Sequence, residues 1–288
     1  MRSIWLVAVL LLSPLCPAAD ADPRALDAEA AKQSSIYQTR GENVPSGYVV
    51  DRSLLSYAST LLPGFDRALA NLGPRDRWLD IGAGQGRAIL DYYGQRFDAM
   101  HAEGRERRGT KARSVAMSIE DRRTPQWQET AARLPDGQLQ YWFGRPLREY
   151  SAEELGRFQL VSDLVGGFSY SRYLSVFMER VLVALEPGGS FYSILLDVLP
   201  EKAPDRARYP DARLLTEIVD ARGADVTVCS WLKRIACADV QCESRIEAGR
   251  PVEVYRVSKI CSAVSVPALE LVSYEAGTPP VRGFRLAP

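Results

Sequence analysis

Glycines recur at alternate positions directly after a short apolar run, in the segment RWLDIGAGQGRAIL, residues 77–90. Residues 77–81 predict a strand and residues 85–97 a helix, so the glycines fall in the turn between them. Glycine takes positive φ without strain, and the amides that open a helix have no partners within it. The segment therefore predicts a site for a nucleotide-type ligand. Its turn residues are Gly82, Ala83, Gly84 and Gly86.

The spacing of these glycines narrows the chemistry of the ligand. Folds that bind dinucleotides favour GxGxxG, and the phosphate loop requires GxxxxGK[ST]. The present chain has GxGxG instead, with Asp80 two residues before Gly82. An acid at this position can pair with a cationic group of a ligand or can organise the turn.

Acidic residues also follow two later apolar runs. Residues 113–121 predict a second strand that ends in Glu120 and Asp121, and Asp163 lies in a strand that begins at Phe158. Open α/β sheets bind ligands outside the carboxyl ends of their strands. Glu120 can accept two hydrogen bonds from a pair of hydroxyl groups. Asp163 can act as a base or can orient other groups.

Two residues just beyond Asp163 are candidates to face a substrate. They are Tyr170 and Ser171, and the alternative is that they are only the polar start of the next helix.

The surrounding elements alternate between strands and helices. Apolar residues at helical spacing predict a helix from Asp51, which would cap it, and further helices over residues 65–72 and 174–185. Additional strands are expected over residues 137–144 and 190–198. This order predicts a Rossmann-like, doubly wound α/β fold with a mostly parallel sheet.

The chain beyond residue 198 follows a different pattern. We expect a helix over residues 211–222, and then two β-rich runs, 225–235 and 252–262, that form a final antiparallel pair. The predicted divisions of the chain are a signal peptide (1–21), an arm or lid (22–50), the α/β domain (51–262) and a C-terminal extension (263–288).

The N-terminus predicts export from the cytoplasm. Arg2 precedes an apolar run, and Ala19–Ala21 offers small residues for cleavage, while the run is too short to span a bilayer. Four cysteines cluster in the C-terminal third, an even number that suggests two disulfides in an oxidising compartment. Several pairings are possible, and we favour Cys237 with Cys242 and Cys229 with Cys261. The alternatives are free thiols or a zinc site, which the distant single His101 and the lack of paired CxxC disfavour.

Charge and composition limit the partners. The chain has 36 basic and 36 acidic residues, and 46% of its residues are hydrophobic. The net charge is therefore zero, which does not favour binding to nucleic acid or to an anionic membrane, so a small-molecule substrate is expected.

Four segments in this order resemble the class I S-adenosylmethionine-dependent methyltransferases. They are LDIGAGQGRAIL, SIED, LVSDLVGGFSYS and VLVALEPGGSFYSIL. The resemblance implies that S-adenosylmethionine is the cofactor, that the glycine turn lies beneath its methionine part and that Glu120 accepts its ribose hydroxyls. The implied cofactor-binding residues are Asp80, Gly82, Ala83, Gly84, Gly86, Glu120 and Asp163.

The same resemblance implies methyl transfer by in-line displacement, a reaction that depends mainly on alignment of the two reactants. Arg145 stands where many members of the family place an acid, and the tetrad of base-methylating enzymes is absent at residues 163–166. An export signal is unexpected for an enzyme whose cofactor is made in the cytosol, unless the true start site lies further downstream. Two alternatives therefore stay open: an exported binding module that keeps the fold, and an aminopropyl-transferase-like enzyme.

Overall fold

The structure is a computed structural model, and the residues that it describes are 51–94, 111–199, 208–275, 279 and 281–287. The predicted signal peptide, the predicted arm and His101 lie outside these residues. Among the described residues, no helix is both long and apolar enough to cross a membrane.

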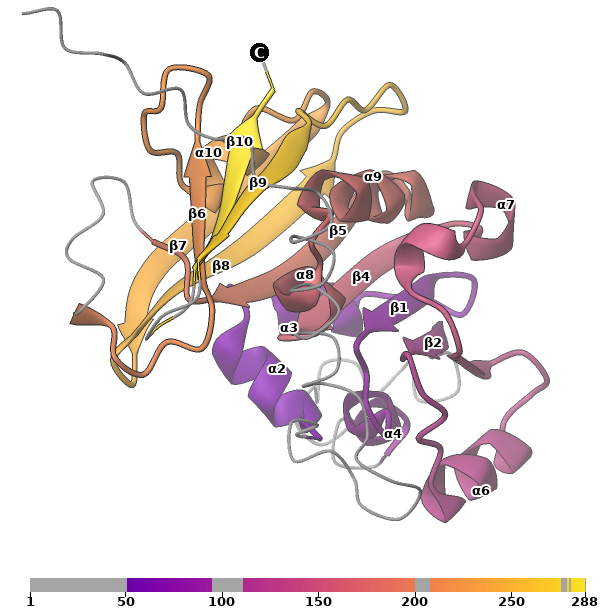
Figure 1. Ribbon diagram of the computed structural model, residues 1–288. Helices are drawn as coiled ribbons and strands as arrows, with labels where there is room; N and C mark the ends of the chain where they lie inside the picture. The colour runs from indigo at the N-terminus through magenta and orange to yellow at the C-terminus, as the bar shows by residue number, and fades with distance from the viewer. Residues whose placement is uncertain (1–50, 95–110, 200–207, 276–278, 280, 288) are drawn as a thin grey trace, which may run out of the picture.

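A seven-stranded sheet forms the centre of the molecule, and its strand order is β3-β2-β1-β4-β5-β8-β7 (Figure 1). The first five strands of this order are parallel, whereas β8 runs antiparallel to both of its neighbours. The prediction of a mostly parallel α/β sheet with a final antiparallel pair is therefore confirmed. The strands are β1 (Arg77–Ile81), β2 (Arg113–Met117), β3 (Leu139–Trp142), β4 (Phe158–Leu164), β5 (Leu185–Leu196), β7 (Ala238–Glu247) and β8 (Arg250–Lys259).

Helices cover both faces of this sheet, because successive strand residues point to opposite sides. Trp78 of β1 packs into a core with α2, α3 and α4, whereas the adjacent Leu79 packs into a core with α9. The helices are α2 (Leu54–Thr60), α3 (Phe65–Ala70), α4 (Arg87–Tyr93), α6 (Pro125–Arg133), α7 (Ala152–Leu155), α8 (Gly167–Tyr170), α9 (Leu174–Ala184) and α10 (Val228–Leu232). A short 3₁₀ turn, η2, spans Leu147–Glu149.

A second sheet of three strands lies beside the first, with the order β6-β10-β9 (Figure 1). Its strands are β6 (Leu215–Val219), β9 (Leu269–Glu275) and β10 (Val281–Leu286). Two of these strands come from the segment predicted as a C-terminal extension. Leu269 and Phe284 belong to the same core cluster as the residues of α9.

Two predictions in the C-terminal region are wrong. The helix predicted over residues 211–222 is instead β6, which pairs with β10 more than sixty residues later in the chain. The strand predicted over residues 225–235 contains α10, whose Ser230 amide donates to the capping Thr227 hydroxyl at 2.9 Å. At β6, pairing with a strand distant in the sequence overrides the local helical pattern. At α10, Thr227 lies inside the apolar run and caps a helix, which the strand prediction did not take into account.

The antiparallel pair also differs from its prediction in one strand. β8 lies where it was expected, but its partner β7 comes from the hydrophilic segment before it. β7 forms the edge of the sheet, where a strand needs few buried side chains. Its composition therefore gave little indication of a strand.

Both disulfides join other cysteines than those we favoured. Cys229 of α10 bonds to Cys242 of β7, and Cys237 bonds to Cys261, with Cα–Cα distances of 6.1 and 5.3 Å. The pairing Cys237–Cys242 assumed a loop, but both residues lie on or next to the extended strand β7. Five residues of extended chain span about 16 Å, farther than a disulfide can bridge, so each cysteine bonds to a different neighbour.

Candidate functional site

The glycine turn lies where it was predicted, between β1 and α4 at the carboxyl end of the parallel strands. Gly82, Gly84 and Gly86 have φ values of 70°, 56° and 75°. A Cβ atom on Gly82 would lie 2.5 Å from the Cα of Gly166, and one on Gly86 would clash with the ring of Trp127. The turn thus needs glycine for its backbone conformation and also for close packing against its neighbours.

The protein itself already uses several amides of this turn. The Ala83 amide donates to the Met117 carbonyl at 3.0 Å, and the Gly86 amide donates to the Ala83 carbonyl at 2.8 Å. The Gln85 amide donates to Asp51 at 2.9 Å. These three amides hold the turn in place, so they are not available to a ligand in this conformation.

Asp51 therefore has a different role from the helix cap that was predicted. The cap of α2 is Ser53, whose hydroxyl accepts a hydrogen bond from the Ser56 amide at 3.3 Å. The helix begins two residues later than expected, which leaves the Asp51 carboxylate to bind the Gln85 amide in the turn.

Asp80 is fully buried beneath the turn. Both of its oxygens accept from the Tyr57 hydroxyl at 2.9 Å, and one also accepts from the Ser162 hydroxyl at 2.7 Å. Burial raises the pKa of this carboxyl from 3.8 to about 7, although the hydrogen bonds from Ser162 and Tyr57 favour the charged form. Of the two roles expected for Asp80, the contacts in the structure are those that organise the turn, because they tie β1 to α2 and β4.

Asp163 lies next to Ile81 on the adjacent strand β4 and is also fully buried. Its oxygens accept from the Gly166 and Phe168 amides at 2.6 and 2.8 Å. Burial raises its pKa to about 7 against the effect of these two bonds. Val165, in the same loop, has a φ of 55°, which a β-branched residue rarely adopts. Asp163 therefore holds the start of α8 in a strained loop beside the glycine turn.

Glu120 follows β2 at the same edge of the sheet. Its carboxylate receives a hydrogen bond from Arg122 at 2.6 Å, and 31% of its side chain is exposed. Two large apolar side chains nearby in the sequence, Ile119 and Phe143, are 60% and 45% exposed. The Tyr141 hydroxyl donates to the Gly84 carbonyl at 2.5 Å and contacts the Glu120 carbonyl at 3.4 Å, so Glu120 and the glycine turn lie side by side.

The two predicted substrate residues lie at the end of α8. Tyr170 is 44% exposed. The Ser171 hydroxyl accepts from the Tyr173 amide at 3.0 Å, and its carbonyl accepts from Arg282 at 2.9 Å. The structure thus brings Asp80, Asp163 and the glycines together, and places Glu120 and Tyr170 on either side of them.

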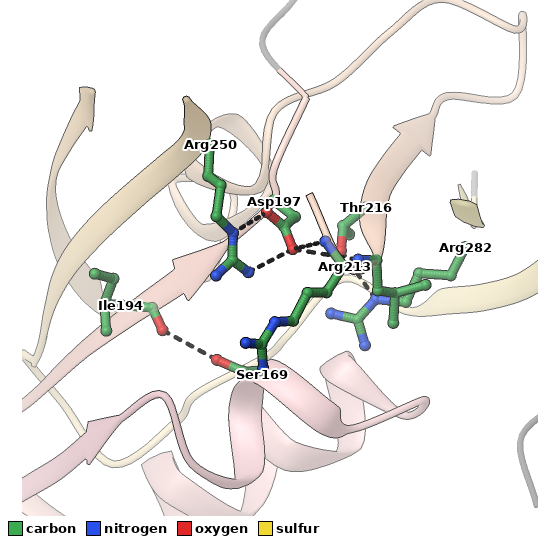
Figure 2. Close-up of polar contacts among 8 residues, drawn as sticks. Ser169, Ile194, Asp197, Arg213, Thr216, Arg250 and Arg282 are labelled. Carbon is green, nitrogen blue, oxygen red and sulfur yellow. Dashed lines mark hydrogen bonds and ion pairs between the residues drawn. The ribbon is translucent and has the colours of Figure 1, made fainter. Parts of the chain in front are cut away.

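Sequence reasoning missed a group of charged residues beyond β5. Asp197 is the first residue after that strand, and it is buried with a φ of 62°. Figure 2 shows the side chains of Arg213, Arg250 and Arg282 around it. Asp197, like Glu120, is an acid that follows a strand, so the same reasoning could have identified it from the sequence. The arginines come from distant segments and carried no such signal.

Two other features of the described residues bear on ligand binding. Among the described residues, no cluster of histidine, cysteine, aspartate and glutamate could hold a metal ion. A cavity of about 340 Å³ lies at the end of the second sheet, where Asp220, Glu270 and Arg285 line it, and it includes none of the predicted site residues.

The similarity of this chain to known proteins is one of overall structure. No protein-family model matches the sequence, and no curated protein matches it. Among solved structures, YjhP from E. coli has 11% identity and a TM-score of 0.44, covering 74% of this chain and 96% of its own. An rRNA methylase from Streptococcus thermophilus has 12% identity and a TM-score of 0.40, covering 74% of this chain and 100% of its own.

A third structure is phosphoethanolamine N-methyltransferase 2 from Haemonchus contortus, in complex with S-adenosyl-L-methionine. It has 12% identity and a TM-score of 0.43, covering 81% of this chain and 57% of its own. The strand order and directions of the present sheet give the chain the Rossmann-like, doubly wound α/β fold with a final antiparallel pair that the resemblance to class I S-adenosylmethionine-dependent methyltransferases predicted.

Proposed function

We propose that this protein binds S-adenosylmethionine at the glycine turn and transfers its methyl group to a small-molecule acceptor by in-line displacement. The observation that carries the proposal is the turn itself. It bears three glycines with positive φ, and it follows the strand at which the order of the sheet reverses. Ligands of open α/β sheets bind at this switch point.

The side chains around the turn fit a nucleoside with hydroxyl groups. Glu120 offers a partly exposed carboxylate, and a carboxylate accepts strong hydrogen bonds from a pair of hydroxyls. Ile119 and Phe143 offer exposed apolar surface against which a flat ring can pack.

S-adenosylmethionine supplies an activated methyl group, so the chain mainly has to align the acceptor. Tyr170 and Ser171 are the proposed acceptor-facing residues, on the helix α8 that Asp163 holds in place. Because both oxygens of Asp163 already accept from backbone amides, we assign it the role of orienting this helix.

The surroundings of Tyr170 favour this proposal over an aminopropyl-transferase-like reaction. Among the charged groups that act on the Tyr170 hydroxyl, the three arginines Arg52, Arg213 and Arg250 outnumber the one acid, Asp163. A polyamine acceptor is cationic and would be repelled by these arginines. An enzyme of that class would need an acidic pocket here.

Export into an oxidising compartment is part of the proposal. The pairs Cys229–Cys242 and Cys237–Cys261 support it, because disulfides persist mainly outside the cytosol.

Titration calorimetry with S-adenosylmethionine and S-adenosylhomocysteine tests the cofactor site. Glu120→Gln should weaken binding by about tenfold or more, because a hydrogen bond to a charged group contributes about 1.5–3 kcal/mol. Asp121→Asn is the matched control, since Asp121 pairs with Arg123 much as Glu120 pairs with Arg122. The control should bind as the unchanged protein does.

Two outcomes would count against the proposal. If neither ligand binds at millimolar concentration, the cofactor assignment fails and with it the enzyme. If binding occurs but no methyl transfer is found with any acceptor, the protein is an exported binding module that keeps the fold.

A further inference from the structure

Arginines from three separate segments gather beside the carboxyl end of β5, close to the proposed acceptor residues. Arg213 precedes β6, Arg250 begins β8 and Arg282 lies in β10. We propose that this arginine cluster (Arg213, Arg250 and Arg282) binds the anionic group of the methyl acceptor, so that the acceptor is a small molecule with a phosphate or carboxylate group. This inference rests on the proposed function and names its substrate class.

Asp197 fixes one side of the cluster. Its two oxygens accept from Arg250 at 2.8 and 2.7 Å, a two-point contact that sets the plane of the guanidinium group (Figure 2). The same carboxylate accepts from the backbone amides of Arg213 and Leu214 at 2.9 and 3.2 Å. One buried acid therefore positions Arg250 through its side chain and Arg213 through its backbone.

Arg213 is the exposed member of the cluster. Asp197 binds its backbone amide, and in Figure 2 the side chain extends from there in the direction of Ser169 of α8. The charges of Arg213 and Arg250 both act on the Tyr170 hydroxyl, where they oppose the rise in its pKa caused by burial, although the residue keeps 44% of its surface exposed. Both arginines therefore lie close to the proposed acceptor residue.

Arg282 links the cluster to the end of helix α8, where the proposed acceptor residues lie. It is buried, and it donates to the Thr216 hydroxyl and to the Ser171 carbonyl, both at 2.9 Å. Ser169 donates to the Ile194 carbonyl at 3.3 Å. Helix α8 is thus held by Asp163 at its start and by Arg282 at its end. An anion held at the cluster would lie beside this helix, on the side away from the glycine turn.

The charge of this region contrasts with that of the whole chain. Acidic and basic residues balance in the full sequence, whereas three arginines gather here near the single carboxylate of Asp197, which pairs with the guanidinium group of Arg250. Guanidinium groups bind phosphate and carboxylate in a planar, two-point geometry. Arg52, which also acts on Tyr170 and Asp163, adds to the positive field at this edge.

The test is calorimetric titration of the full mature chain with inorganic phosphate and, separately, with succinate, at ionic strength matched by chloride. S-adenosylhomocysteine is titrated in a parallel experiment. We expect one of the two anions to bind, and the identity of the stronger one distinguishes a phosphate from a carboxylate acceptor. Arg213→Gln should weaken that binding about tenfold or more. It keeps the amide bond to Asp197, so the protein should stay folded.

Two further variants sharpen the result. Arg213→Lys keeps the charge but loses the planar fork, so its affinity should fall between those of Arg213→Gln and the unchanged protein. Arg285→Gln is the matched control, because Arg285 is exposed on the same strand as Arg282 but lines the separate cavity beside Glu270. It should bind the anion with unchanged affinity.

The proposal is overturned if neither anion binds, if Arg213→Gln binds as the unchanged protein does, or if Arg285→Gln weakens binding equally. If S-adenosylhomocysteine binds and the anions do not, only this inference fails. If an anion binds through Arg213 and S-adenosylhomocysteine does not bind, the cluster is an anion site and the proposed function fails.

Discussion

The parts of the chain before and after residue 199 are built differently. In the first part, strands of the parallel sheet are followed by helices, and β1, β2 and β4 end at the glycine turn, Glu120 and Asp163. In the second part, β7 and β8 follow each other directly in a hairpin, β6 pairs with the distant β10, and two disulfides tie the segment. The first part offers residues suited to a nucleoside, and the second contributes the arginine cluster.

The two parts therefore have different proposed roles. In the proposed function, the first part binds the cofactor, and Asp80 beneath the glycine turn is held by contacts with α2 and β4. The second part covers the carboxyl end of β5, where its arginines can select an acceptor. We expect the two parts to respond differently to substitution.

The largest expected effect is removal of the disulfides. Each closes a short stretch of chain, with sequence separations of 13 and 24 residues, and loss of such a bond typically costs about 2–5 kcal/mol. Reduction should therefore lower the Tm strongly. Hydrogen exchange should increase in β7 and α10 well before it increases in β1 and β2.

Paired alanine variants separate the two bonds. One variant replaces Cys229 and Cys242, and the other replaces Cys237 and Cys261. A Tm that reductant leaves unchanged, or cysteines that alkylate without reduction, would show that the second part does not depend on these bonds.

A smaller effect is expected from a methyl group added in the glycine turn. Gly82→Ala combines a φ of 70° with a clash against Gly166, and should lower the free energy of unfolding by about 2–4 kcal/mol. Gly188→Ala is the control, because Gly188 has a φ of 88° but open space around its Cβ position. It should cost only about 1–2 kcal/mol. Urea unfolding measures both values, and equal losses would mean that the close contact with Gly166 is unimportant.

The third expected effect concerns the pH dependence of stability. The pKa of Asp80 is raised from 3.8 to about 7 in the folded protein, so the folded state retains a proton that the unfolded state releases. The free energy of unfolding should therefore fall as pH rises from 4 to 7, and then level off. Asp80→Asn cannot titrate, and should make this decline shallower.

Urea unfolding at several pH values checks this prediction. Asp163 keeps its own raised pKa, so part of the decline should remain in the variant. A variant whose pH profile matches that of the unchanged protein would show that Asp80 is charged throughout this range.

The difference between the two parts also explains which elements could be predicted from the sequence. β1 was predicted at residues 77–81, as found, and Asp163 was placed correctly at the carboxyl end of β4. These features depend on runs of apolar residues and on turn residues next to them. β6 was mistaken for a helix, because its strand conformation depends on β10, more than sixty residues away.

The amino-acid sequence by itself determined the alternation of strands and helices, the glycine turn and the acids that follow the parallel strands, since each of these depends on neighbouring residues. The tertiary structure alone decided that Tyr57 binds Asp80, which cysteines bond and that Arg213, Arg250 and Arg282 meet beside Asp197. These contacts join residues far apart in the chain. They form only when the sheets bring distant segments together, so no local pattern records them.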